Sequence, residues 1–145
     1  MSNKLVKPQQ QNNVIVVDDG SKAYDIVNKR GKKLGEFEFR PSDTNIVKRY
    51  EEVVDFFNNF SLPEDSEKAM QEAESQMVEK MSYLIGGDAG DAFFSIMGPF
   101  SALASGELFV ENVLASIAKV IENELSIRTK RVQRRMNKYV AKYHK

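Results

Sequence analysis

The sequence predicts an α+β fold that is mainly α-helical: short N-terminal β-strands with a hairpin, then an amphipathic helical bundle that ends in a long C-terminal helix. Apolar and charged residues alternate between Gly35 and Arg40, which is the period of a strand. From Ile46 onward the apolar residues recur at spacings of three and four, which is the period of a helix packed on one face. The 145-residue chain is long enough to bury one core.

The first predicted strand is a run of β-branched residues. Residues 14–17 read Val-Ile-Val-Val and are followed by the turn formers Asp18, Asp19 and Gly20. β-branched side chains favour extended backbone, and Asp and Gly end such runs in turns. Residues 1–12 are polar, rich in Gln and Asn and without periodicity, so we expect a flexible tail before this strand.

A hairpin is predicted next. Residues 23–27 lead into a basic turn around Gly31, and an extended stretch with Phe37 and Phe39 follows as far as Pro41. Because Phe37 and Phe39 are two residues apart, a strand would place both rings on one face and the charges between them on the other. We therefore predict two strands joined around Gly31.

Two amphipathic helices should follow the hairpin. Ser, Asp and Thr after Pro41 supply side-chain oxygens that cap a first turn, and residues 61–63 end this helix. The second helix is predicted over residues 64–85 and ends at a pair of glycines, Gly86 and Gly87. The apolar stripes are Ile46, Val47, Tyr50, Val53, Val54, Phe57 and Phe60 in the first helix, and Ala69, Met70, Ala73, Met77, Met81 and Leu84 in the second.

The last third of the chain predicts a short helix and then a very long one. Residues 92–97 suit a short helix that Gly98 and Pro99 stop. From residue 107 to 143 one helical pattern continues, whose second half is sparser in apolar residues, so we expect its last turns to project. The seam consists of Leu108, Val113, Leu114, Ile117, Val120, Ile121 and Leu125. We divide the chain into a tail (1–12), one α+β domain (13–125) and a basic helical extension (126–145).

Composition and charge limit the class of protein. Apolar residues make up 41% of the chain and charged residues 29%, which is typical of a globular protein. The net charge is zero, but residues 51–91 hold eleven acids against two lysines, and residues 128–145 hold eight bases and no acid. Segments of opposite sign attract one another, within the fold or between copies, so we expect a homo-oligomer. No apolar signal-peptide core or membrane span is found, which favours a cytoplasmic protein without a membrane partner.

The sequence lacks the parts that common catalytic sites need. It has no cysteine, which excludes disulfides, thiolate metal sites and a cysteine nucleophile. The single histidine, His144, lies next to the C-terminus, where nothing positions it beside a nucleophile. Residues 86–91 read Gly-Gly-Asp-Ala-Gly-Asp but lack the Lys of a phosphate loop and the spacing of a calcium loop. We predict no catalytic residues, no metal site, no cofactor and no enzymatic activity.

Two constellations are candidates for binding. The basic C-terminal segment is a candidate for charged interaction, either with nucleic acid phosphates or with an acidic protein surface. Its candidate residues are Arg128, Lys130, Arg131, Arg134, Arg135 and Lys138. A glycine-flanked apolar cluster either fills the core between two long helices or forms an adaptable protein-binding surface. This cluster consists of Phe93, Phe94, Ile96, Met97, Phe100 and Leu103.

The layout resembles one known family. A strand-and-hairpin start, an acidic helical middle, the glycine-flanked apolar cluster and a basic helical end are similar to the small tail assembly chaperones of long-tailed bacteriophages, most of all over residues 86–143. The resemblance implies a non-enzymatic protein that coats the tape measure protein, or binds other tail proteins, until tail tube subunits replace it. Such proteins often self-associate. Two alternatives remain open at this point: a structural component of a virion or other assembly, and a nucleic-acid-binding module that uses the basic helix.

Overall fold

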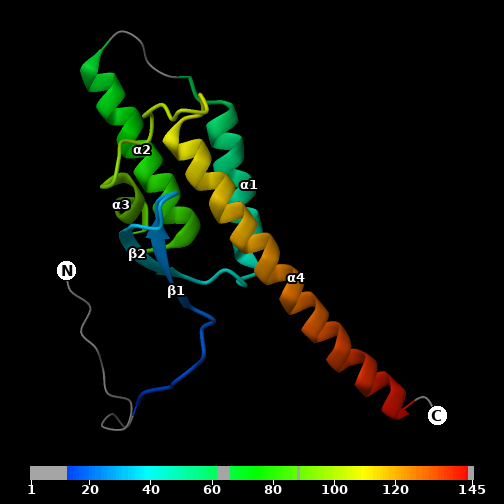
Figure 1. Cartoon of the computed structure of the whole chain (residues 1–145). Helices are drawn as coiled ribbons and strands as arrows, with labels where there is room; N and C mark the ends of the chain where they lie inside the picture. Colours follow the sequence, from blue (N-terminus) through cyan, green and yellow to red (C-terminus); the bar gives the residue numbers. More distant parts are fainter. Residues whose placement is uncertain (1–12, 62–65, 88, 144–145) are drawn as a thin grey trace.

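The computed structural model describes residues 13–61, 66–87 and 89–143, and it describes side chains as far as Ser126. It contains an antiparallel two-stranded hairpin followed by four helices, which confirms the predicted mainly helical α+β fold. In Figure 1, α1, α2 and the first half of α4 form a bundle, and the hairpin and α3 lie against it. The elements are β1 (Lys22–Val27), β2 (Lys33–Phe39), α1 (Asn45–Asn58), α2 (Glu67–Ile85), α3 (Ala89–Phe94) and α4 (Phe109–Tyr143).

The predicted hairpin around Gly31 is confirmed. Tyr24 of β1 lies opposite Phe37 of β2 in the antiparallel register. The Asn28 side chain closes the turn because its Oδ1 atom accepts hydrogen bonds from the amides of Arg30 (2.9 Å) and Lys32 (3.0 Å). Gly31 has a φ of 84°, which glycine adopts without the steric cost of a side chain.

One face of the hairpin is aromatic and packs on the helices. Tyr24 and Phe37 stack with ring centroids 5.8 Å apart, and Phe39 lies 5.4 Å from Phe37. The alternation of Phe with charged residues in β2 therefore places both Phe rings on one face of the strand, as predicted. Phe37 also reaches Phe93 of α3 at 4.9 Å, so aromatic contacts join the sheet to the helices.

Side-chain oxygens accept backbone amides at the starts of α1 and α2, although the N-cap residue of α1, Thr44, makes no side-chain capping hydrogen bond. Asp43 Oδ1 accepts a hydrogen bond from the Asn45 amide (2.9 Å), within the predicted helix-start segment. Ser66 Oγ accepts one from the Ala69 amide (3.0 Å), so α2 begins at Glu67, three residues later than predicted. α2 ends as predicted before Gly86, whose φ is 87°.

The start of α3 is fixed by a close approach to α2. α3 begins at Ala89, three residues before the predicted short helix. A Cβ atom on Gly90 would lie 2.5 Å from the Val78 carbonyl oxygen, so only glycine fits at this contact. α4 starts at Phe109, where Glu111 Oε1 accepts a hydrogen bond from the Leu108 amide (2.9 Å). Its helical backbone continues to Tyr143, and Figure 1 shows it extending beyond the other helices.

The core lies between the aromatic face of the hairpin and the apolar faces of the helices. Most of the residues expected to face inward in α2 and α4 are buried, including Met77, Met81 and Leu84 in α2. The core cluster is Phe39, Ile46, Val53, Met77, Met81, Leu84, Ile85, Ala89, Phe93, Val110, Val113, Leu114, Ile117 and Ile121. Lys22 of β1 pairs with Glu124 of α4 at 2.6 Å, which ties the hairpin to the long helix.

The prediction of a strand at residues 14–17 is wrong. These residues, which we call the apolar arm, lie outside the sheet and pair with no strand in the described part of the chain. Ile15 is 88% exposed and Val17 is 72% exposed. β-branched residues favour an extended backbone, but a strand also needs an edge to pair with, and the arm does not reach one.

Candidate protein-binding site

The predicted apolar cluster is partly core and partly surface. Phe93 is buried and belongs to the core. The other five members, Phe94, Ile96, Met97, Phe100 and Leu103, are half-buried. Phe100 stacks on Phe60 at 5.5 Å, and Phe94 meets Phe109 edge to face at 6.1 Å. The first contact joins the chain just after α1 to the segment before α4, and the second joins the end of α3 to the start of α4, so the cluster contributes to packing as well as to the surface.

The segment that carries this cluster is held by backbone hydrogen bonds. The Phe109 amide donates to the Ser101 carbonyl (2.8 Å), and the Val110 amide donates to the Pro99 carbonyl (2.9 Å). The Leu103 amide donates to the Glu107 carbonyl (2.9 Å). The segment is therefore anchored to the first turn of α4, and its half-buried apolar residues form a fixed surface rather than a hinged one.

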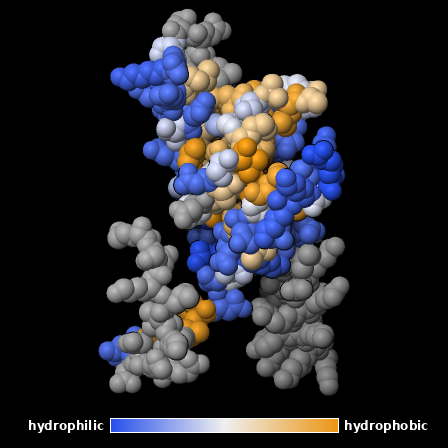
Figure 2. Space-filling view, turned by 60° about the vertical axis from the view of Figure 1, so that its left-hand side comes forward, coloured by the Kyte–Doolittle hydropathy of each residue, from blue (hydrophilic) through white to orange (hydrophobic). Residues whose placement is uncertain are grey.

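Figure 2 shows where apolar surface gathers. Hydrophobic residues gather at the centre and right of the body on this face, next to a hydrophilic projection at the upper left and above a hydrophilic lower part. A separate hydrophobic segment lies below the body next to the grey N-terminal residues, at the place of the apolar arm in Figure 1. The arm is the more exposed of the two features, because its members include the three most exposed large hydrophobic residues in the described structure, Ile15, Val16 and Val17.

Two aspartates fix the direction in which the arm leaves the body. Asp18 Oδ1 accepts the Gly20 amide (2.9 Å), and Asp19 Oδ1 accepts the Ser21 amide (3.0 Å). The Arg40 guanidinium donates twice to Asp19 Oδ2, at 2.7 and 3.1 Å. Hydrogen bonds from the Ser21 hydroxyl and amide, followed by the one from Arg40, lower the pKa of Asp19 from 3.8 to about 2. The carboxylate is thus a charged anchor at ordinary pH.

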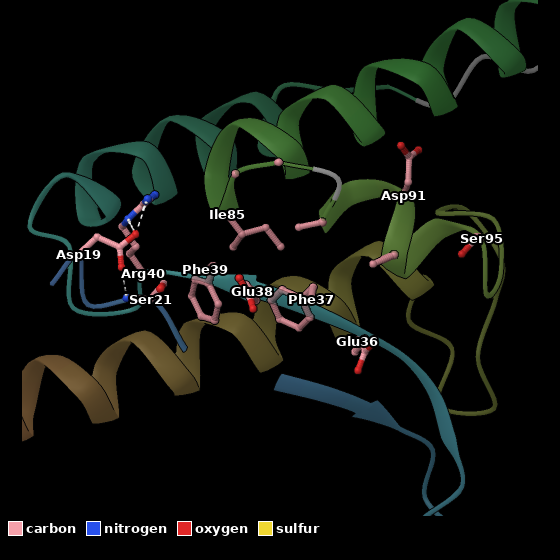
Figure 3. Close-up of a pocket in the computed structure, with 14 residues that line it drawn as sticks. Asp19, Ser21, Glu36, Phe37, Glu38, Phe39, Arg40, Ile85, Asp91 and Ser95 are labelled. Carbon is pink, nitrogen blue, oxygen red and sulfur yellow. Dashed lines mark hydrogen bonds and ion pairs between the residues drawn. The ribbon is translucent and has the colours of Figure 1, made fainter. Parts of the chain in front are cut away.

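An open groove begins at this anchor and follows β2. Its volume is about 750 Å³, and its walls are the outer edge of β2, the C-terminus of α2 and the start of α3. Figure 3 shows Asp19, Ser21 and Arg40 at one end, Phe37 and Phe39 along the middle, and Asp91 and Ser95 at the α3 end. Carboxylates dominate the charged lining, which consists of Asp19, Glu36, Glu38, Asp91 and Arg40.

The outer face of the hairpin carries exposed ion pairs. Lys33 Nζ lies 3.0 Å from Glu36 and 3.4 Å from Asp25. The hydrogen bond to Glu36 and the charge of Asp25 raise the pKa of Lys33 above its usual value. Such exposed pairs add little to stability, and they keep this face hydrated.

The basic C-terminal residues that the sequence predicted as an interaction site lie where the structure describes the backbone alone. The side chains of Arg128, Lys130, Arg131, Arg134, Arg135 and Lys138 lie outside the described residues, as do His144 and residues 1–12. Within the described part, no group of three potential metal ligands is found. None of the described helices is both long enough and apolar enough to cross a membrane.

No protein-family model matches the chain, and neither the curated proteins nor the solved structures that were compared include a significant match. The functional interpretation therefore depends on the site itself. Two features have no partner among the residues that the structure describes: the exposed apolar arm, and the groove beside the edge of β2 that faces away from β1. The residues of the arm were predicted to form a strand, and the groove was not predicted, because it is made by residues far apart in the sequence.

Proposed function

We propose that this protein is a non-enzymatic assembly chaperone that binds other protein chains through its apolar arm. One observation carries the proposal: Val14, Ile15, Val16 and Val17 are exposed, although the same chain buries similar residues elsewhere. Contiguous exposed apolar residues mark interaction sites in soluble proteins. An extended run of β-branched residues suits contact with another polypeptide, either along a strand edge or in an apolar groove.

The size of the arm favours weak, reversible binding. Burying one Val or Ile side chain contributes roughly 1.5–3 kcal/mol, so four give about 6–12 kcal/mol before costs. Association itself costs about 4–15 kcal/mol. The balance allows a complex that forms and dissociates, which a chaperone requires because later subunits must replace it on its client.

The half-buried aromatic surface adds a second contact region. Phe94, Phe100 and Leu103 are half-buried on a segment that hydrogen bonds hold in place. A client that contacts both this surface and the arm would gain affinity from the combination, since the second contact forms at high effective concentration.

The family resemblance supplies the specific client. Tail assembly chaperones, to which the layout of this chain is similar, bind the tape measure protein, a long helical and hydrophobic polypeptide. We propose a tape measure protein as the client, held in the cytoplasm of the host until tail tube subunits arrive.

Co-expression tests this proposal directly. The tape measure protein of the same gene cluster is expressed alone, with the wild-type chain, and with an arm variant in which residues 14–17 are all serine. The wild-type chain should keep the client in the soluble fraction, and the arm variant should not. Val47→Ser is the matched control, because Val47 is also exposed (41%) but lies on α1.

The outcomes are distinct. A client that is equally insoluble with and without the wild-type chain contradicts the proposal. Mass spectrometry of purified particles gives a second readout, since a chaperone is absent from the finished particle. Copies that remain in stoichiometric amount would instead identify a structural component.

A further inference from the structure

We propose that, when no client is bound, the apolar arm of one copy adds as a third strand to the free edge of β2 in a second copy, and that the exchange is reciprocal. This inference rests on the proposed function in one respect, because it uses the same arm as the binding element. It adds the identity of the resting partner and the place where the arm binds.

The hairpin offers a strand edge that the structure leaves open. Within the described part of the chain, β2 pairs with β1 alone, in a two-stranded sheet. In a strand, the N–H and C=O groups that do not face the paired strand point away from it and can pair with another chain. Among the described residues, none of residues 34–39 makes a backbone hydrogen bond outside the hairpin. A third strand would add backbone hydrogen bonds along this edge.

The groove has the position and length that an added strand requires. It exposes β2 over residues 36–39, and the arm also has four residues, so the two segments match in extended length at about 3.3 Å per residue. The opposite wall, which includes Ile85 and Ala89, brings apolar contacts from α2 and α3 to the same edge. Figure 3 shows this wall facing Phe37 and Phe39 of β2.

The negative charge of the groove favours the N-terminal segment of a second copy as its occupant. The groove is lined by the carboxylates of Asp19, Glu36, Glu38 and Asp91; Arg40 pairs with Asp19 and Lys33 pairs with Glu36, so Glu38 and Asp91 supply the excess negative charge. An acidic segment would be repelled there. Residues 1–17 contain Lys4 and Lys7 and no Asp or Glu, so this segment brings an uncharged run with positive charge before it.

The local geometry directs the arm to a second copy rather than to its own groove. Asp19 is held at one end of that groove by Arg40, and Asp18 is engaged with the Gly20 amide. A reversal into the same groove would need a turn between Val17 and Asp19, where Asp18 is the only residue. The arm instead runs away from the hairpin, as Figure 1 shows. Exchange of an identical segment between two copies satisfies both arms through one symmetric contact.

Cross-linking tests the contact in the absence of any client. The chain has no cysteine, so introduced thiols are unique. Copies that carry Val16→Cys are mixed with differently tagged copies that carry Glu38→Cys, and a short bifunctional thiol reagent is added. We expect cross-linked heterodimers for this pair. Lys48→Cys replaces Glu38→Cys in the control, because Lys48 is exposed on α1 and does not line the groove.

A measurement of mass provides the second test. Sedimentation velocity should show a dimer for the wild type and for Val47→Asp, and at least tenfold weaker association for the double variant Ile15→Asp/Val17→Asp, whose carboxylates would meet those of the groove. A wild type that remains monomeric at high micromolar concentration overturns the inference. A cross-link confined to monomers of a chain with both cysteines also overturns it, because the arm would then occupy its own groove.

These results are separable from the chaperone test. If the client is kept soluble but no exchanged dimer forms, the inference fails and the proposed function stands. If the dimer forms but the client stays insoluble, the proposed function fails and the arm is a self-association element only.

Discussion

The apolar arm and the apolar seam of α4 contain similar residues in opposite environments. In the arm, Ile15 is 88% exposed, whereas Ile117 and Ile121 of α4 are 3% and 5% exposed. Side-chain chemistry is the same in both, so it does not decide burial. The seam residues recur at helical spacing on a helix whose neighbours present matching faces, whereas the arm leaves the body at Asp19. The comparison teaches that burial depends on the availability of a partner surface.

Truncating a residue in the packed core should give the largest loss of stability. Leu84 has no exposed surface and lies in the core cluster. We expect Leu84→Ala to lower the free energy of unfolding by about 2–5 kcal/mol, because it removes buried contacts and leaves a cavity. Urea denaturation measures the change. Val47→Ala should change stability by less than about 0.5 kcal/mol. A loss below about 1 kcal/mol for Leu84→Ala would mean that this core is not closely packed.

A methyl group at the contact between α2 and α3 should have the next largest effect. In Gly90→Ala the new Cβ would lie 2.5 Å from the Val78 carbonyl oxygen and 2.6 Å from Ser82 Oγ. We expect a loss of about 1–3 kcal/mol, because overpacking forces the two elements apart. Thermal unfolding provides the measurement. Gly98→Ala is the control, since its nearest neighbour would be 3.5 Å away; equal effects of the two substitutions would contradict the close approach.

A substitution in the arm should leave the stability of the monomer nearly unchanged. Ile15→Ser removes a large apolar side chain but no packed contact, so we expect the free energy of unfolding of the isolated monomer to change by less than about 0.5 kcal/mol. Self-association should weaken in the same variant. Denaturation at low micromolar concentration, together with light scattering at high concentration, separates the two effects. A large loss of monomer stability would show that the arm packs on its own body.

The pair of Asp19 and Arg40 at the base of the arm should give the smallest effect, which is a change in the pKa of Asp19. Asp19 has a folded pKa of about 2 against an ordinary 3.8, so its stabilising interactions are present above about pH 4 and are lost as the pH falls through about 2. In Arg40→Gln we expect the pKa of Asp19 to rise, but to stay below 3.8 because the Ser21 hydrogen bonds remain. Carboxyl NMR titration measures this shift. An unchanged pKa would mean that Arg40 does not hold the anchor.

Much of the fold could be predicted because its patterns are local. The alternation in β2 and the turn around Gly31 specify the hairpin, and the spacing of Met77, Met81 and Leu84 specifies the buried face of α2. Boundaries were less accurate where a contact between distant residues decides them. α3 begins at Ala89 because Gly90 fits against Val78, and no periodicity in residues 89–97 indicates that approach.

The candidate site was predicted only in part, for a related reason. The apolar cluster was identified from composition, but which of its members enters the core depends on the position of Phe37 relative to Phe93. β-propensity favoured a strand for the arm, but propensity says nothing about whether a strand edge lies within reach. The Asp19–Arg40 pair, which sets the direction of the arm, joins residues 21 positions apart and leaves no local signal.

The two aspartates that follow the arm protect the protein against aggregation. A short, uncharged, β-branched segment without proline is the kind of sequence that nucleates cross-β aggregates when exposed. Charged residues placed beside such a segment act as gatekeepers, because stacking the segment in register would also stack their charges. Asp18 and Asp19 occupy that position. Because the Asp19 carboxylate has a pKa of about 2, it stays ionised under acidic conditions that would neutralise an ordinary aspartate, and this protection against aggregation extends to low pH.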